Sequence, residues 1–297
     1  MGRRAGPTEH LPNSYVSRRS TEAQASSDWT KPTGTLGELT DEAAARAATL
    51  STGLADLQRA ARFASAEPSF ASALKRRDVG IIAEVKRSSP SKGVINSTMA
   101  VDLQATAYEQ GGAAAISILT EPTRFGGSNE DLRQARTATR LPLLKKDFHV
   151  EVSQIFEAKT LGASAALVIV RAVHPARLRE LLQAGREAGI EILVEVRTET
   201  ELDLALAYDA QLIGVNNRNL ETLEIDPETS ARLIPLIPAG RVAIAESGIK
   251  SAADVKRLAA LGADAVLVGS NLSASRDPKD AVVALTGIPR NADARKG

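Results

Sequence analysis

The chain has 297 residues, which is enough for one large α/β barrel or for two smaller domains. Its 37 basic and 36 acidic residues leave a formal net charge of +1, and no apolar run approaches the ~18 residues of a membrane-spanning helix. We therefore expect neither a nucleic acid nor a membrane as a partner. Cysteine is absent and only three scattered histidines are present, which excludes disulfides and cysteine nucleophiles and argues against a metal site.

Two segments precede the main domain. Residues 1–35 are rich in Ser, Thr, Pro and Arg without apolar periodicity, and we expect a disordered tail. This tail lacks the apolar core of a secretory signal, and its acidic residues argue against a transit peptide. Residues 36–78 are rich in alanine and carry Leu50, Leu54 and Leu57 at helical spacing, which predicts a helical extension that packs on the following domain.

Eight short apolar runs then recur at roughly the length of a strand–helix unit, between 20 and 35 residues. Polar residues follow each run, and a helix-like segment follows each of the first seven. This pattern predicts an α/β protein with a (β/α)8 TIM barrel over residues 79–290, and a doubly wound open sheet is the alternative. The predicted strands are 80–85, 114–119, 142–144, 165–170, 190–196, 212–215, 242–245 and 265–268.

Helix boundaries support these units. Glycines at 112, 162 and 262 each stand just before a predicted strand, where a preceding helix needs a left-handed stop. Ser251 and Asp254 have the spacing of a capping box, which marks the start of a helix.

The segment 81–86, Ile-Ile-Ala-Glu-Val-Lys, is the most informative of the apolar runs. Side chains alternate between the two faces of a strand, so Glu84 and Lys86 point to the same side. Taken alone, this pair could also belong to an edge strand whose polar face is exposed to solvent. In a parallel α/β protein, however, active sites are built at the carboxyl ends of the strands.

Polar side chains also end other predicted strands, namely Lys146, Glu195, Asn216 and Glu246. A surface ion pair would explain any one of them, but their recurrence predicts that they converge in the barrel mouth. Buried charges are unfavourable unless they are paired, and here two lysines lie among three glutamates. The sequence therefore predicts a polar catalytic pocket.

Small residues end the last two predicted strands. The pairs Ser247-Gly248 and Gly269-Ser270 would let backbone N–H groups approach an anion. Barrels commonly bind phosphate between strands seven and eight, although glycine also simply ends strands. Pairs at both expected positions favour a phosphate site.

Together these motifs resemble the indole-3-glycerol-phosphate synthase family. The resemblance is collinear over roughly residues 70–277, and the segment before Pro68 matches poorly. It implies a (β/α)8 barrel with extra N-terminal helices, and a carbon–carbon lyase of tryptophan biosynthesis. Such an enzyme converts carboxyphenylamino-deoxyribulose phosphate into indole-3-glycerol phosphate, carbon dioxide and water, without a metal or an organic cofactor. The matching segments are 84–93, 111–121, 125–128, 144–148, 193–196, 214–218, 245–249 and 268–270.

The resemblance also implies catalytic roles. Lys146 would be the general acid at the substrate carbonyl, which requires neighbours and burial to bring its pKa towards the working pH. Glu195 would act as base or acid in the later loss of water. Lys86 would contact the phosphate and could serve as a further acid. Glu84 and Asn216 would orient the reacting groups.

Binding roles follow in the same way. Glu246 would hold the catalytic network together, and Ser247 would contact the substrate. Ser89 and Arg218 would meet the anthranilate carboxylate. The phosphate would lie against Lys86, Gly248, Gly269 and Ser270, and the aromatic ring would lie among Pro90, Phe125, Phe148, Leu167 and Leu220.

Rival functions and partners complete the expectations. A related barrel, phosphoribosylanthranilate isomerase, relies on a cysteine that this chain lacks. A non-catalytic barrel that binds a phosphorylated sugar remains the alternative. We expect a cytoplasmic monomer that acts on a small phosphorylated substrate, with other enzymes of tryptophan biosynthesis as further candidate partners.

Overall fold

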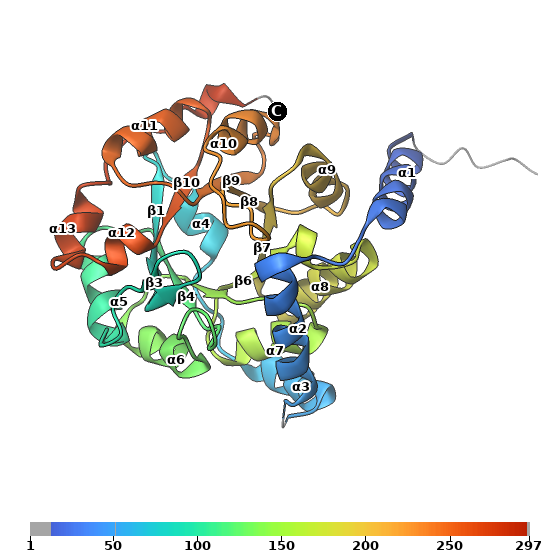
Figure 1. The fold of residues 1–297 in the computed structure, drawn as a ribbon, viewed down its shortest axis with the longest axis horizontal. Coiled ribbons are helices and arrows are strands. Elements are labelled where there is room, and N and C mark those ends of the chain that lie inside the picture. Colours follow the sequence, from blue (N-terminus) through green and yellow to red (C-terminus); the bar gives the residue numbers. More distant parts are fainter. Residues whose placement is uncertain (1–12, 51, 296–297) are drawn as a thin grey trace, which may run out of the picture.

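A closed barrel of eight parallel strands forms the centre of the molecule (Figure 1). The computed structural model describes residues 13–50 and 52–295, and these strands lie within that part of the chain. Each of the eight predicted strands is confirmed, with ends that differ by at most two residues. The strands are β1 (Gly80–Val85), β4 (Ala115–Leu119), β5 (Leu143–Lys146), β6 (Ala165–Ile169), β7 (Glu191–Val196), β8 (Leu212–Asn216), β9 (Val242–Glu246) and β10 (Ala265–Val268).

Neighbouring strands pair in chain order, and β1 closes the barrel against β10. All residues of β1, β4, β6, β8, β9 and β10 are buried, because the barrel interior covers one face and the outer helices cover the other. This burial explains why the strands read as nearly continuous apolar runs. The fold is the predicted TIM barrel and not an open sheet.

Helices surround the barrel (Figure 1). None of the helices described is long and apolar enough to span a membrane. The helices after β1 are α5 (Val101–Gln110), α6 (Asn129–Ala138), α7 (Val152–Thr160), α8 (Pro175–Ala188), α9 (Glu199–Ala207), α10 (Glu228–Leu233), α11 (Ala252–Ala260), α12 (Ser270–Ser273) and α13 (Pro278–Val283). Short 3-10 turns span Val170–Ala172, Ile234–Leu236 and Ala292–Ala294.

The expected helix signals are confirmed. Ser251 accepts a hydrogen bond from the Asp254 amide, and the Asp254 carboxylate accepts one from the Ser251 amide, so the capping box is complete. Gly112, Gly162 and Gly262 have φ values of 88°, 85° and 97°, as the left-handed stops require. A two-stranded hairpin after β1, formed by β2 (Ser88–Ser89) and β3 (Gly93–Val94), was not predicted.

The N-terminal extension consists of three helices: α2 (Gly34–Ala48), α3 (Leu54–Phe63) and α4 (Phe70–Leu74). Leu50 lies between α2 and α3, whereas Leu54 and Leu57 lie on α3, so the three leucines belong to a helical segment but do not share one helix. Gly53 precedes α3 as its N-cap, which marks the break. The extension contacts the barrel helices, and α3 packs on α7.

The structure differs from the disorder expected for residues 1–35. Helix α1 spans Asn13–Asp28, and residues 1–12 lie outside the described part of the chain. Helix α1 contacts α8 and α9 at the side of the barrel (Figure 1), and Glu22 on it accepts a bond of 2.9 Å from Arg179. Tertiary contacts of this kind stabilise helices whose own sequence is a weak signal, which explains why composition alone indicated a tail.

Phe63 and Phe70 give a matched test of how the N-terminal extension is held. Phe70 is completely buried, whereas Phe63 is 85% exposed. We expect Phe70→Ala to lower the free energy of unfolding by about 3–5 kcal/mol because it leaves a cavity. We expect Phe63→Ala to change it by less than about 0.5 kcal/mol. Urea unfolding followed by circular dichroism measures both values, and equal effects would contradict this account of α4.

Candidate active site

A cavity of about 300 Å³ opens at the carboxyl ends of the barrel strands. Its lining contains every predicted site residue except Glu246, which lies just behind the cavity wall against Lys146. The structure therefore brings together residues that span most of the barrel sequence. They are Glu84, Lys86, Ser89, Pro90, Phe125, Lys146, Phe148, Leu167, Glu195, Asn216, Arg218, Leu220, Ser247, Gly248, Gly269 and Ser270.

Lys146 stands at the centre of the charged groups. Its Nζ lies 2.5 Å from Glu246 Oε2, 3.8 Å from Glu84 Oε2 and 4.0 Å from Glu195 Oε2. Burial favours the neutral amine, but these three carboxylates outweigh burial and raise the pKa of Lys146 above its ordinary value. The expectation that the site lowers this pKa was therefore wrong, and the lysine is a protonated ammonium at neutral pH.

For Glu195, burial sets the direction of the pKa shift, whereas for Lys146 the neighbouring charges set it. Burial, together with the nearby Glu246 charge, raises the pKa of Glu195 to about 8, although Lys146 and a hydrogen bond from Asn216 act against this rise. Asn216 Nδ2 donates to Glu195 Oε1 over 2.9 Å, which orients the carboxyl group. At neutral pH the free protein therefore holds a proton on Glu195.

Glu84 and Lys86 form an ion pair of 2.6 Å at the end of β1, on the shared strand face that the sequence predicted. Burial raises the pKa of Glu84, but the charges of Lys86 and Lys146 outweigh it and hold this pKa below its usual value. The Ser273 hydroxyl donates to the Glu84 carbonyl over 2.8 Å and accepts from the Lys86 amide over 3.2 Å. This serine ties α12 to the strand end that carries the pair.

Two glycines leave room for the carboxylates. A Cβ atom on Gly214 would overlap Glu246 Oε1, and one on Gly269 would overlap Glu84 Oε1. Gly214 is paired with Glu195 on the neighbouring strand, so it stands between two acidic side chains. The close approach of these groups thus depends on residues without side chains.

The two ends of the cavity differ in chemistry. One side carries a cation, hydroxyls and small residues that follow the neighbouring strands β1, β9 and β10, namely Lys86, Ser247, Gly248, Gly269 and Ser270. This set suits an anionic group, because ammonium and backbone N–H groups can face it without steric obstruction.

The other end is apolar, and two aromatic rings stand in it. Phe125 and Phe148 have ring centroids 6.4 Å apart at an angle of 39°. Leu167, Leu220 and Pro90 complete this lining.

Arg218 supplies a cation near the apolar end. Its Nη1 donates to the Leu223 carbonyl over 2.7 Å, and within the described residues it has no carboxylate partner. Burial lowers the pKa of Arg218, which reflects the lack of a compensating anion. An anionic ligand in the cavity would supply that charge.

Several lining residues were missed by the sequence analysis. Thr35 and Leu39 come from α2, Lys250 comes from the loop after β9, and Asn271 comes from α12. Nothing in the sequence indicates that α2 reaches the barrel mouth, because its contacts are tertiary. Lys92 also lines the cavity and could have been found, since it lies within the motif that begins at Glu84.

Side chains that could hold a metal ion do not gather anywhere in the described part of the chain. The polar groups that line the cavity are acids, bases and hydrogen-bond donors.

Gly214→Ala tests the packing of the acidic groups. The added methyl group would displace the Glu246 carboxylate from Lys146, and we expect turnover to fall by about tenfold or more, because small displacements in a site are costly. Gly240→Ala is the matched control, since its Cβ would meet nothing within 4 Å. Steady-state kinetics of both variants measure the effect, and full activity of folded Gly214→Ala would contradict it.

Comparisons with known proteins agree with this geometry. A family model for indole-3-glycerol phosphate synthase matches residues 39–285. The indole-3-glycerol phosphate synthase of Mycolicibacterium gilvum is 46% identical over 244 residues, which cover 82% of this chain and 89% of that protein. The enzyme of the same name from Kineococcus radiotolerans is 50% identical over 211 residues, covering 71% of this chain and 77% of that protein.

Solved structures with low sequence identity share the fold. Thiamine phosphate pyrophosphorylase from Pyrococcus furiosus superposes with a TM-score of 0.52 at 15% identity and covers 70% of this chain and 93% of that one. This similarity supports the barrel architecture alone.

Proposed function

The chain belongs to the indole-3-glycerol phosphate synthase family, and we propose that the cavity at its barrel mouth carries out the reaction of that family with the residues described above. The reaction closes a ring in 1-(2-carboxyphenylamino)-1-deoxyribulose 5-phosphate and releases carbon dioxide and water. The observation that carries the assignment of roles is a protonated Lys146 held among three buried carboxyl groups.

Substrate binding uses both ends of the cavity. The phosphate lies against Lys86, Gly248, Gly269 and Ser270, and the carboxylate of the aromatic ring lies against Ser89 and Arg218. The ring itself lies between the phenylalanines at the apolar end. Anchoring both ends folds the flexible substrate so that its ring carbon approaches its own carbonyl, which lowers the entropic part of the barrier.

Ring closure uses Lys146 as the general acid. The ring carbon that bears the carboxylate attacks the carbonyl carbon, and the Lys146 ammonium transfers a proton to the carbonyl oxygen as its π bond breaks. Because carboxylates raise its pKa, Lys146 is present in the acid form before the reaction starts. Loss of carbon dioxide then returns an electron pair to the ring and restores its aromaticity.

Dehydration completes the product. The nitrogen electron pair expels the hydroxyl group, and Glu195 donates the proton with which this group leaves as water. The resulting Glu195 carboxylate removes a proton from the adjacent methylene carbon, which forms the indole double bond. Glu195 thus recovers its proton, and Lys146 regains its own from solvent.

Supporting roles fall to the remaining polar groups. Asn216 holds the Glu195 carboxyl group through its 2.9 Å hydrogen bond, and Glu246 holds the Lys146 ammonium. Glu84, ionised beside Lys86, positions that lysine for the phosphate. A non-catalytic sugar-phosphate binder would not need a protonated lysine and a protonated glutamate side by side, so we do not favour that alternative.

We further propose that the protein acts in the cytoplasm as a monomer on this small phosphorylated substrate. Its membership of a biosynthetic family supports this location, and the complete site within one chain supports a monomeric catalyst.

Lys146→Ala tests the assignment of the general acid. We expect kcat to fall by about 10²- to 10⁴-fold, because the carbonyl oxygen loses its proton donor. The fluorescence of the indole product, followed without added metal, measures turnover. Lys256→Ala on the exposed face of α11 is the matched control and should keep wild-type rates. Wild-type protein without turnover would reject the function itself, whereas an active Lys146→Ala variant would reject only the role of this lysine.

The protonation of Glu195 predicts a pH dependence. The free protein must hold this proton, and the pKa is about 8, so kcat/KM should decline about tenfold per pH unit above about pH 8. Glu195→Gln should lose most turnover because an amide cannot transfer the proton. Glu199→Gln, at an exposed position at the start of α9, should keep the wild-type profile. A rate that stays constant up to pH 9.5 would contradict the acid role.

A further inference from the structure

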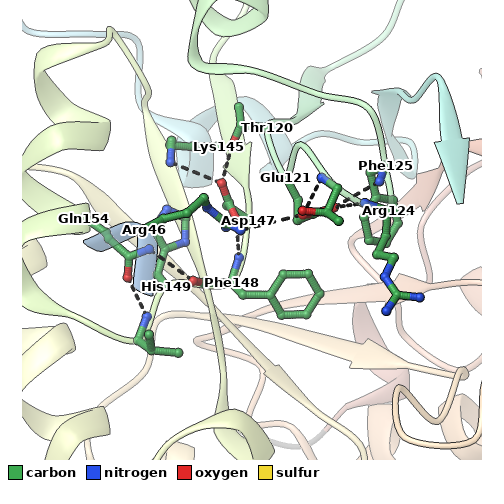
Figure 2. A network of polar contacts seen from close by, with 12 residues as sticks. Arg46, Thr120, Glu121, Arg124, Phe125, Lys145, Asp147, Phe148, His149 and Gln154 are labelled. Atoms are coloured by element: carbon green, nitrogen blue, oxygen red, sulfur yellow. Dashed lines mark hydrogen bonds and ion pairs between the residues drawn. The ribbon is translucent and has the colours of Figure 1, made fainter. Parts of the chain in front are cut away.

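Asp147 organises the loop that places Phe148 in the cavity (Figure 2). Its Oδ1 accepts from the Phe148 amide over 2.8 Å, and its Oδ2 accepts from the Thr120 hydroxyl over 2.8 Å. At the carbonyl of the same residue, Gln154 Nε2 donates to the Phe148 oxygen over 3.3 Å. The backbone on both sides of this phenylalanine is therefore held by buried polar groups.

Glu121 organises the loop that places Phe125 (Figure 2). This completely buried carboxylate accepts three backbone N–H bonds, at 2.7 Å from Thr123, 2.7 Å from Arg124 and 3.0 Å from Phe125. Its two oxygens thus fix the turn that aims the second aromatic ring at the cavity. Neither carboxylate belongs to the catalytic groups.

Arg46 joins the two loops from outside the barrel. It lies on α2, and its Nη2 donates to Asp147 Oδ1 over 2.7 Å while its Nη1 lies 3.6 Å from Glu121 Oε1. Nη1 is buried and makes no hydrogen bond, so Glu121 is its ionic partner. The two terminal nitrogens of the Arg46 guanidinium therefore each face one of the carboxylates that hold the loops of Phe125 and Phe148.

Few other cations lie close enough to Asp147 and Glu121 to replace the Arg46 guanidinium. Lys145 Nζ lies 3.6 Å from Asp147 Oδ2, but Arg46 is the cation that the described residues place within 4 Å of Glu121. Burial raises the pKa of Asp147, whereas Lys145, His149 and Arg46 together lower it to about 2, so this group stays ionised. Removing the guanidinium leaves a buried carboxylate without its cation, and the loop must shift to solvate it.

We propose that Arg46 is a positioning residue that sets the spacing of Phe125 and Phe148 and thereby the affinity of the cavity for the aromatic ring of the ligand. This inference rests on the proposed function, because it assigns the ring to that end of the cavity. The N-terminal extension is thus a part of the aromatic subsite, reaching it through Arg46 as well as through the lining residues of α2.

The test compares a ligand that has the ring with one that lacks it. Indole-3-glycerol phosphate and glycerol 3-phosphate share the phosphate end, and calorimetry measures the Kd of each. In Arg46→Gln we expect the Kd of indole-3-glycerol phosphate to rise by about tenfold, and the Kd of glycerol 3-phosphate to stay within about twofold of wild type. If this variant does not fold, Arg46→Lys keeps a charge without the guanidinium group and should give the same ring-selective loss to a smaller degree.

Ser69→Ala is a control that distinguishes the positioning of the aromatic rings by Arg46 from a general loss of stability of the N-terminal extension. Ser69 donates to Glu191 over 2.7 Å at the start of β7, which is the opposite end of the barrel from the cavity. We expect this control to lower thermal stability and leave both Kd values unchanged.

Three results would overturn the proposal: unchanged affinity for indole-3-glycerol phosphate in a folded Arg46 variant, equal weakening of both ligands, or the same ring-selective loss in Ser69→Ala. Wild-type turnover, measured in parallel, distinguishes these results from a failure of the proposed function.

Discussion

The site depends on one shared cation. Lys146 lies within 4.0 Å of three buried carboxyl groups, and the charges of Glu246 and Glu84 contribute most to keeping it protonated. Glu195 keeps a proton because its burial and the nearby Glu246 charge, in that order, outweigh the opposing effect of Lys146 on its pKa. A single electrostatic balance therefore prepares two different acids at neutral pH.

The barrel makes this balance geometrically possible. Parallel strands in register carry Glu84, Lys146, Glu195, Asn216 and Glu246 to the same edge, and closure of the sheet turns that edge into a ring. Glycines at positions 214 and 269 leave space that the carboxyl groups of Glu246 and Glu84 occupy. Catalytic groups sit on rigid strand ends, whereas the ligand-binding rings sit on loops that need separate support.

That support comes from the N-terminal extension. Its Arg46 reaches the carboxylates behind both aromatic rings, and Thr33 and Thr35 bond to Glu221 in the loop after β8. The extension is therefore attached to loops on two sides of the cavity. Its contribution is energetic and geometric, since none of these residues faces the reacting carbonyl in the proposed mechanism.

The sequence by itself determined the eight strands, their polar ends and the family, because recurring apolar runs and motif spacing are local properties of the chain. It placed Glu84 beside Lys86 for the same reason. Tertiary structure alone decided the direction of the Lys146 pKa, the helix at Asn13–Asp28 and the reach of Arg46 into the aromatic subsite. Each of these depends on groups brought together from distant segments, whose distances and burial no local pattern encodes.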